Sequence, residues 1–167
     1  MANTDMAAVF AAGARAAAVL MARRQTVAVA EGATGGLVSA ALLAVPGASA
    51  CYLGGAVVYT PRARHRLLGL KREDVAGIKS ASEPWAMLAA QTVRQRFSAT
   101  WGIAESGAAG PRSNPYGDAA GHSCIAVAGP ADAVRTLATG SSDRIGNMAA
   151  FAVALLDMLV AQAQAQA

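Results

Sequence analysis

The stretch 27-VAVAEGATGGLVSAAL-42 decides the fold of this chain. Its first residues are apolar and do not alternate with polar ones up to Glu31, which is typical of a central strand covered on both faces. A small, glycine-rich turn follows, and a helical pattern begins at Thr34. This turn predicts a ligand site at the carboxyl end of the strand, where free N–H groups of the helix start and Thr34 would receive a ligand oxygen. Tight packing is an equally good explanation of the turn taken alone.

The composition indicates one compact domain over residues 1 to 167, with a frayed tail at 161 to 167. Of the 167 residues, 54% are hydrophobic and 14% charged, and the mean hydropathy is +0.36. A chain of this length can bury a sizeable core, and this balance argues against disorder. We therefore expect one functional site on one domain.

The charge pattern favours a solvated basic helix face, or a small anionic ligand, over nucleic acid. The net charge is +4, but only residues 62 to 72 form a dense basic cluster, with few aromatic residues among the cations. A nucleic-acid-binding surface would combine such a cluster with a recognition motif, and none is present. We expect no nucleic acid partner.

Cysteine spacing and the apolar runs indicate a cytoplasmic protein. Cys51 and Cys124 lie outside any C-x-x-C pattern, so we expect two buried, reduced cysteines and no metal site. The N-terminus does not resemble a secretory leader. Pro46-Gly47 divides the uncharged run between Glu31 and Arg62, so we expect no membrane span there.

The hydrophobic periodicity predicts alternating helices and strands, followed by a hairpin. Strands are expected over residues 26 to 30, 52 to 59, 100 to 106, 122 to 129 and 133 to 140. Helices are expected over 4 to 24, 34 to about 45, 61 to 68, from Ser82 through Phe97, and from Ser142-Asp143 onward with Ile145, Met148, Ala152, Leu155 and Leu159 toward the core.

This order predicts an α/β fold, a three-layer α/β/α sandwich with a mixed, mostly parallel sheet. Ligands bind such sheets at the carboxyl ends of the strands. Three segments are expected there: Glu31 to Gly36, Tyr59 to Arg64, and Ser106 to Pro111.

Several stretches in order, "AEGATGG", "YTPRARHR", "ASEPWA", "GIAESGAAGP" and "GSSDR", resemble the CinA C-terminal domain, the nicotinamide-nucleotide amidohydrolase family, over nearly the whole chain. The resemblance implies the three-layer fold. It also implies a metal-free hydrolase without a cofactor that converts nicotinamide mononucleotide to nicotinic acid mononucleotide and ammonia, and a homodimer.

The sequence departs from the family pattern at the two residues that carry its chemistry. The family has Glu-Ser-x-Thr-Gly-Gly at the first strand end, with the serine as nucleophile, but Gly32 stands at that position. The family's base is a lysine five residues after a tyrosine; here Tyr59 is present and the base position is Arg64. Glycine has no nucleophilic atom, and an arginine side chain stays protonated at working pH, so the usual dyad is absent.

The remaining matches predict a retained nucleotide pocket. The expected ligand-binding residues are Glu31, Gly32, Thr34, Gly35, Gly36, Tyr59, Arg64, Ser106, Gly107 and Gly110. In this interpretation the Arg64 guanidinium pairs with a ligand phosphate.

Three residues are candidates to replace the missing dyad. Thr34 and Ser106 carry hydroxyl groups near the expected site, and His122 lies where a substrate-loop residue is expected and could act as a base. His65 adjoins Arg64 but would point about 100° away around the helix axis. A locally hydrogen-bonded loop histidine is the simpler interpretation of both histidines.

Three hypotheses follow. The first is a nucleotide-binding member of the family with lost or much reduced activity. The second is an active amidohydrolase that uses Thr34 or Ser106 with His122 as a displaced base. The third is a structural role with a vestigial pocket, in which Arg64→Ala would change no ligand affinity.

Overall fold

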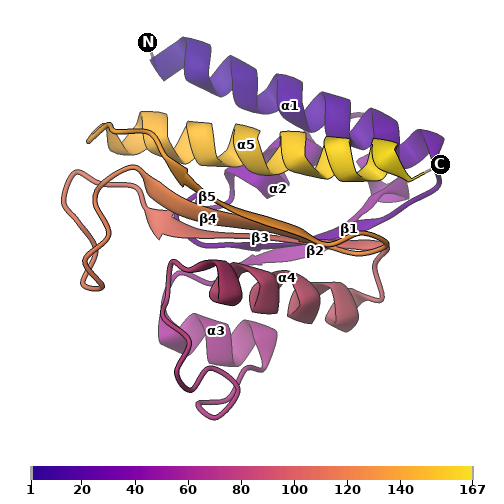
Figure 1. The fold of residues 1–167 in the computed structure, drawn as a ribbon. Coiled ribbons are helices and arrows are strands. Elements are labelled where there is room, and N and C mark those ends of the chain that lie inside the picture. Colours follow the sequence, from indigo (N-terminus) through magenta and orange to yellow (C-terminus); the bar gives the residue numbers. More distant parts are fainter. Residues whose placement is uncertain (1, 167) are drawn as a thin grey trace.

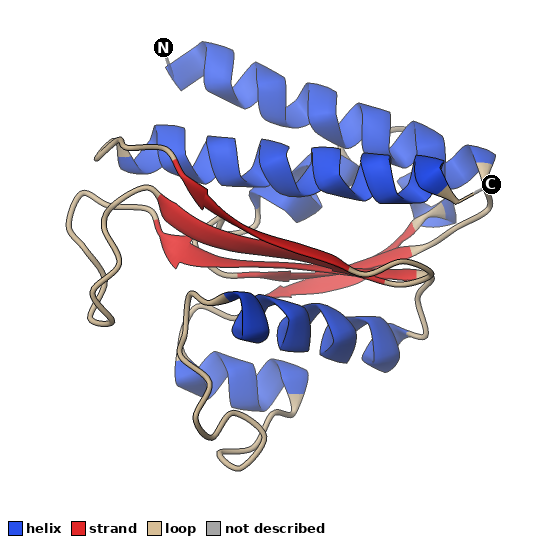
Figure 2. Ribbon diagram, viewed as in Figure 1, coloured by secondary structure: helices blue, strands red, loops and turns tan. Residues whose placement is uncertain are grey.

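A computed structural model describes residues 2 to 166 and the side chains of residues 5 to 166. Helices and strands alternate through the first two thirds of the chain (Figure 2). The elements are α1 (Ala2–Ala22), β1 (Val27–Glu31), α2 (Leu37–Leu43), the short 3-10 helix η1 (Ala48–Ala50), β2 (Tyr52–Val57), α3 (Pro61–Leu68), α4 (Glu83–Phe97), β3 (Trp101–Ala108), β4 (His122–Ala128), β5 (Ala133–Ala138) and α5 (Arg144–Ala165).

The five strands form one mixed sheet in the order β2-β1-β3-β4-β5. β1 pairs in parallel with β2 and β3, whereas β4 is antiparallel to both β3 and β5. Four strands therefore run in one direction and β4 runs against them, which confirms the predicted mixed sheet and the late hairpin. β1 lies between β2 and β3 and is buried along its whole length, as its unbroken apolar pattern predicted.

Helices cover both faces of the sheet and make three layers (Figure 1). α1, α2 and α5 bury one core against one face, and α4 buries a second core against the other. The pleat of β1 separates its side chains: Val27 and Val29 face the first core, and Ala28 and Ala30 face α4. α3 and the loop after it lie beyond α4, away from the sheet (Figure 1).

Small residues let the layers approach closely. A Cβ on Gly102 of β3 would overlap the backbone of Ala90 on α4. Gly13 has the same role on the other face, where a Cβ would lie 2.7 Å from the Cβ of Ala41 on α2 and closer still to its carbonyl oxygen. The glycine in the middle of α1 is therefore required by helix packing, although it lowers helix propensity.

Some boundaries and burial states differ from the sequence predictions. The helix expected from Thr34 begins at Leu37, because Gly35 and Gly36 have φ angles of 64° and 105° that a helix does not tolerate. Ile145 is 55% exposed and does not join the core stripe of α5, because it lies in the first turn, at the solvent-facing end. The segment 161 to 167, expected to fray, continues α5 as far as Ala165.

The strand ends also shift. β1 and β3 extend to Glu31 and Ala108, whereas β2 and β5 end early, at Val57 and Ala138. Pro61–Leu68 is helical as predicted, with the Thr60 side chain accepting a hydrogen bond from the Ala63 amide at its start. Cys51 and Cys124 are buried and unpaired, as expected.

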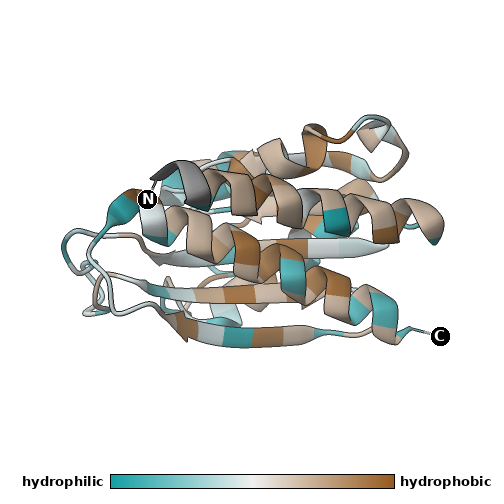
Figure 3. Cartoon of the chain, turned by 90° about the horizontal axis from the view of Figure 1, so that it is seen from above, coloured by the Kyte–Doolittle hydropathy of each residue, from teal (hydrophilic) through white to brown (hydrophobic). Residues whose placement is uncertain are grey.

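α1 and α5 are long and apolar enough to span a bilayer by length and composition alone. In the fold they pack against each other and, with α2, over the sheet. Figure 3, viewed from above, shows these two helices side by side with few hydrophilic residues. Packing into the first core accounts for their buried apolar residues.

Gly13→Ala is expected to destabilise the protein, although this substitution normally stabilises a helix by about 1 kcal/mol. The added methyl group would overlap the backbone of α2, and overpacking of this kind costs about 1–3 kcal/mol. Urea unfolding measures the difference. The exposed neighbour Ala14→Gly is the control and should lose only the propensity difference; a Gly13→Ala variant more stable than the parent would contradict this packing.

Candidate functional site

A cleft lies at the carboxyl ends of β1 and β3 and consists of two adjoining hollows. The inner hollow, of about 180 Å³, is lined by Gly32, Tyr59, Arg64 and Ser106 among others. The outer hollow, of about 320 Å³, is lined mainly by residues 107 to 115. Both include Ala33 and Tyr59. The three segments predicted to meet at this edge therefore do meet.

The Glu31 carboxylate holds the turn between β1 and α2. It is fully buried, and its Oε2 accepts hydrogen bonds from the Thr34 hydroxyl and the Gly36 and Val38 amides, at 2.8, 2.9 and 3.1 Å. Oε1 accepts from the amide and the hydroxyl of Ser39, at 2.8 and 2.6 Å. Glu31 thus satisfies the N–H groups that α2 would otherwise present to a ligand, so its role is positioning rather than ligand contact.

A second buried carboxylate, Glu105 of β3, holds the same turn from the other side. Its Oε2 accepts from the Gly32 and Thr34 amides at 3.2 and 2.9 Å, and its Oε1 accepts from the Ser123 hydroxyl at 3.1 Å. Burial raises the pKa of this carboxyl, and the bonds to Thr34, Ser123 and Gly32 oppose that rise. Glu105 could not be predicted as a site residue from the sequence, because one acidic residue in an apolar strand does not indicate which turn it will contact.

Between them the two carboxylates take most donors of the turn. Gly35 and Leu37 donate to backbone carbonyls within it. In the described part of the chain, the Ala33 amide alone among residues 32 to 36 donates to no protein acceptor, and Ala33 lines both hollows. The turn therefore offers a ligand one backbone N–H, not the row of free donors that the sequence suggested.

The backbone at Gly32 is close to β3. A Cβ there would lie 2.9 Å from the carbonyl oxygen of Glu105 and 3.4 Å from the Cα of Ser106. A residue with a side chain would require the two strand ends to separate by a few tenths of an ångström. The close approach of the β1 and β3 ends therefore depends on glycine at position 32.

Arg64 is bound to its own surroundings. Its Nε donates to the Val58 carbonyl at 3.3 Å, its Nη1 donates to the Ser80 hydroxyl at 2.6 Å, and its guanidinium lies 4.3 Å from the ring centre of Trp85. Partial burial lowers the pKa of Arg64, and Tyr116 opposes that effect. A side chain held in this way lines the inner hollow but presents no basic lone pair to it.

The hydroxyl groups and histidines proposed to replace the dyad are also engaged. Thr34 is fully buried and donates to Glu31, which leaves it no access to a substrate. Ser106 does line the inner hollow, where its Oγ accepts from the Ala81 amide at 3.2 Å. His122 donates from Nε2 to the Ala81 carbonyl at 2.8 Å, so the backbone of Ala81 is hydrogen-bonded to both Ser106 and His122.

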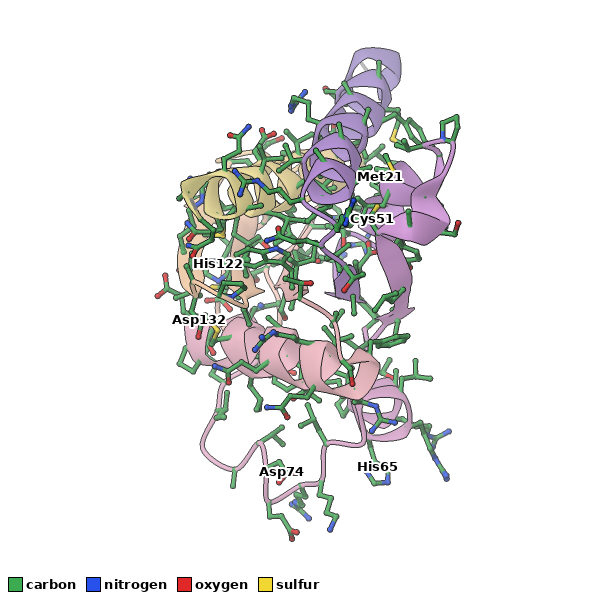
Figure 4. All side chains as sticks on the ribbon, turned by 90° about the vertical axis from the view of Figure 1, so that its right-hand side faces the viewer. Met21, Cys51, His65, Asp74, His122 and Asp132 are labelled. Carbon is green, nitrogen blue, oxygen red and sulfur yellow. The ribbon has the colours of Figure 1, made fainter. Side chains whose placement is uncertain are left out.

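The two histidines lie in separate parts of the molecule, as Figure 4 shows. His122 begins β4; its Nε2 lies 3.8 Å from Asp118 and 3.8 Å from the Cys124 sulfur, and it does not line either hollow. Burial raises the pKa of the Cys124 thiol, which disfavours a thiolate at this position. His65 lies in the region of α3 beyond α4, and neither hollow includes it.

Two arginines at the outer hollow were missed as site residues. Arg112 follows the Gly110-Pro111 turn and is exposed, and Arg144 begins α5 with its Nη1 donating to the Gly110 carbonyl. The only sequence signal for Arg144 was its place in "GSSDR". Together they give the outer hollow two guanidinium groups, and no Asp or Glu of the described chain lines it.

The predicted site residues thus divide into two groups. Gly32, Tyr59, Arg64, Ser106, Gly107 and Gly110 line the cleft. Glu31, Thr34, Gly35 and Gly36 lie behind it and shape the turn.

The sequence of this chain matches a known protein family. A family model described as the CinA C-terminal domain matches residues 11 to 163. The chain belongs to the CinA C-terminal domain family. The resemblance that the motifs indicated is therefore confirmed for the family and its fold.

Relatives and solved structures agree with this assignment. A CinA-like protein of Synechococcus sp. (strain CC9902) is 43% identical over 63% of this chain and 25% of its own length. One from Desulforapulum autotrophicum is 35% identical over 84% of this chain and 34% of its own length. The chain therefore spans between about a quarter and a third of these CinA-like relatives.

Crystal structures of CinA-superfamily proteins match over nearly their whole length. One from Enterobacter cloacae has a TM-score of 0.84 at 29% identity, covering 93% of this chain and 92% of that one. A competence or damage-inducible protein from Enterobacter asburiae has a TM-score of 0.85 at 29% identity, with 93% and 98% covered. The three-layer sheet domain is thus the fold of this family.

Glu31→Gln is expected to destabilise the domain by about 3 kcal/mol. The amide nitrogen of the glutamine would replace one carboxylate oxygen, and its N–H groups would then face the N–H groups of the turn and α2 that now donate to that oxygen. Glu105→Gln is the matched control. Its amide oxygen can accept from Gly32 and Thr34 while its nitrogen donates to Ser123, so it should be at least as stable as the parent. Chemical unfolding at pH 7 measures both; equal losses would contradict the geometry of the Glu31 carboxylate.

Glu105→Gln should also change the pH dependence of stability. A carboxyl whose pKa is raised in the folded state does not change the free energy of unfolding at low pH, where it is protonated in both states. As pH rises from the unfolded pKa, near 4.5, through the folded pKa, the carboxyl lowers the free energy of unfolding. The parent should therefore lose melting temperature relative to Glu105→Gln as pH rises above the unfolded pKa. The exposed Glu73→Gln is the control, and a difference that does not grow with pH would contradict the raised pKa.

Proposed function

We propose that this domain binds a nicotinamide mononucleotide-like nucleotide in the cleft and does not hydrolyse its amide at the rate of its family. The observation that carries the proposal is the close approach of Gly32 to β3. A Cβ added to Gly32 would lie only 2.9 Å from the Glu105 carbonyl oxygen. The position of the family's nucleophile thus has neither a reactive atom nor space for one without a shift of β3.

The shape and charge of the cleft support a ligand with two different ends. The guanidinium groups of Arg112 and Arg144 suit a phosphate at the outer hollow. The inner hollow combines the Tyr59 ring with the free Ala33 amide and the Ser106 hydroxyl, which suit a flat ring bearing a carboxamide. In this arrangement Arg64 forms the wall of the inner hollow, and the phosphate role assigned to it from the sequence passes to the outer arginines.

Turnover lacks a base as well as a nucleophile. Of the two hydroxyl groups proposed as replacements, only Ser106 lines the inner hollow, and His122 donates its Nε2 proton to the Ala81 carbonyl. Activation of a serine needs a base within hydrogen-bond reach that can accept its proton. Binding without efficient hydrolysis is therefore the function that the cleft supports best.

Binding is tested by isothermal calorimetry with nicotinamide mononucleotide. The parent is expected to bind, and Arg112→Ala should weaken binding about tenfold through loss of a charge-assisted hydrogen bond to the phosphate. Arg135→Ala on β5 removes the same charge away from the cleft and is the control. Absence of binding, or equal weakening by the two variants, would contradict the proposal.

Turnover is tested by ammonia release from the same compound. The parent is expected to remain at the background rate of heat-denatured protein. Release that is lost in both Ser106→Ala and His122→Gln would instead establish the active amidohydrolase with a displaced base. The third hypothesis, a vestigial pocket, predicts neither binding nor release.

A further inference from the structure

A larger cavity lies outside the cleft, between α3, the loop at residues 69 to 81 and the start of α4. Its volume is about 590 Å³. Its apolar lining consists of Leu70, Val75, Ile78, Trp85 and Pro61. Arg64 and Ser80 separate it from the inner hollow, because both line both spaces. Figure 1 shows this region as a protrusion on the far side of α4 from the sheet.

The walls of this cavity are ordered. Within the loop, the Lys71 and Asp74 backbones are joined by a hydrogen bond of 3.1 Å, and the Asp74 carboxylate accepts from the Lys71 amide at 2.7 Å. At its start, Arg96 of α4 donates to the Leu68 carbonyl at 3.3 Å. The His65 Nδ1 must be the donor to the Leu70 carbonyl, 3.1 Å away, because that oxygen can only accept. Hydrogen bonds within the loop, and between the loop and α3, therefore hold its shape.

The rim of the cavity carries one sign of charge. Arg64, His65, Lys71 and Arg72 line it, and no Asp or Glu of the described residues does. Lys71 has a partner in Glu73 at 3.8 Å, but that pair is exposed and contributes little. Arg64 already donates hydrogen bonds to the Val58 carbonyl and the Ser80 hydroxyl. Arg72 is thus the lining cation most available to an external anion.

We infer that this cavity is a second ligand site, which takes a small amphipathic anion with an apolar body and one anionic head group. Leu70, Val75 and Ile78 receive the body, since burial of its surface is the main source of affinity in such a site. Arg72 and Lys71 receive the head group at the rim. A cation would be repelled by this rim, and a neutral ligand would gain nothing from it.

The site is separate from the cleft and does not depend on the nucleotide proposal. The two share only the Arg64 and Ser80 side chains, which stand as a wall between them. A ligand here contacts neither Gly32 nor the outer arginines. Each site can therefore be tested with variants that leave the other intact.

The probe is 8-anilino-1-naphthalenesulfonate, whose fluorescence rises on transfer to an apolar site. Its neutral analogue N-phenyl-1-naphthylamine has the same ring system without the sulfonate. Arg72→Glu reverses the charge at the rim. Arg66→Glu makes the same change on the exposed side of α3, outside the cavity lining, and Arg112→Ala alters only the cleft.

We expect the sulfonate to bind the folded parent at one site, with at least tenfold weaker binding in Arg72→Glu and less than twofold change in Arg66→Glu and Arg112→Ala. The neutral analogue should bind more weakly than the sulfonate and should be unaffected by Arg72→Glu. Thermal unfolding of each variant confirms that it is folded. No binding, equal effects of Arg72→Glu and Arg66→Glu, or loss of binding in Arg112→Ala would overturn the inference.

Discussion

The buried carboxylate of Glu31 is the interaction on which the cleft depends. It ends the central strand and accepts five hydrogen bonds from the turn and the first residues of α2, so one side chain fixes the angle between strand and helix. Glu105 fixes the same turn to β3. A buried charge is costly unless its hydrogen bonds are complete, and here the donors come from backbone that would otherwise be unsatisfied. The turn is consequently rigid before any ligand arrives.

That rigidity supports the proposal of a site that binds without efficient hydrolysis. The two carboxylates and the carbonyls of the turn accept hydrogen bonds from its amides except that of Ala33, a residue that lines the cleft. At Gly32 the backbone of β1 lies close to that of β3. The Arg64 guanidinium packs on Trp85 and bonds to Ser80. In the proposed function the cleft is therefore a binding site in which Gly32 and Arg64 have packing roles.

Sequence patterns were sufficient for features set by local chemistry. The buried pattern of β1, the Pro61 start of α3 and the motif spacing predicted the fold and the segments that line the cleft. They failed where partners come from distant strands: nothing near Glu105 indicates that its carboxylate holds Gly32, 73 positions away. Likewise the residue types of Thr34 and His122 do not indicate that the first is fully buried or that the second is hydrogen-bonded to the Ala81 carbonyl. These contacts depend on packing between elements rather than on residue type.

The proposed function requires an intact nucleotide in the cleft beside Gly32. A crystal structure of the protein soaked with nicotinamide mononucleotide would show whether it is there. We expect an unmodified carboxamide near the Ala33 amide, the phosphate against Arg112 and Arg144, and no covalent bond to the protein. A bond from Ser106 to the ligand, nicotinic acid mononucleotide in the cleft, or a cleft that stays empty at saturating ligand would contradict it.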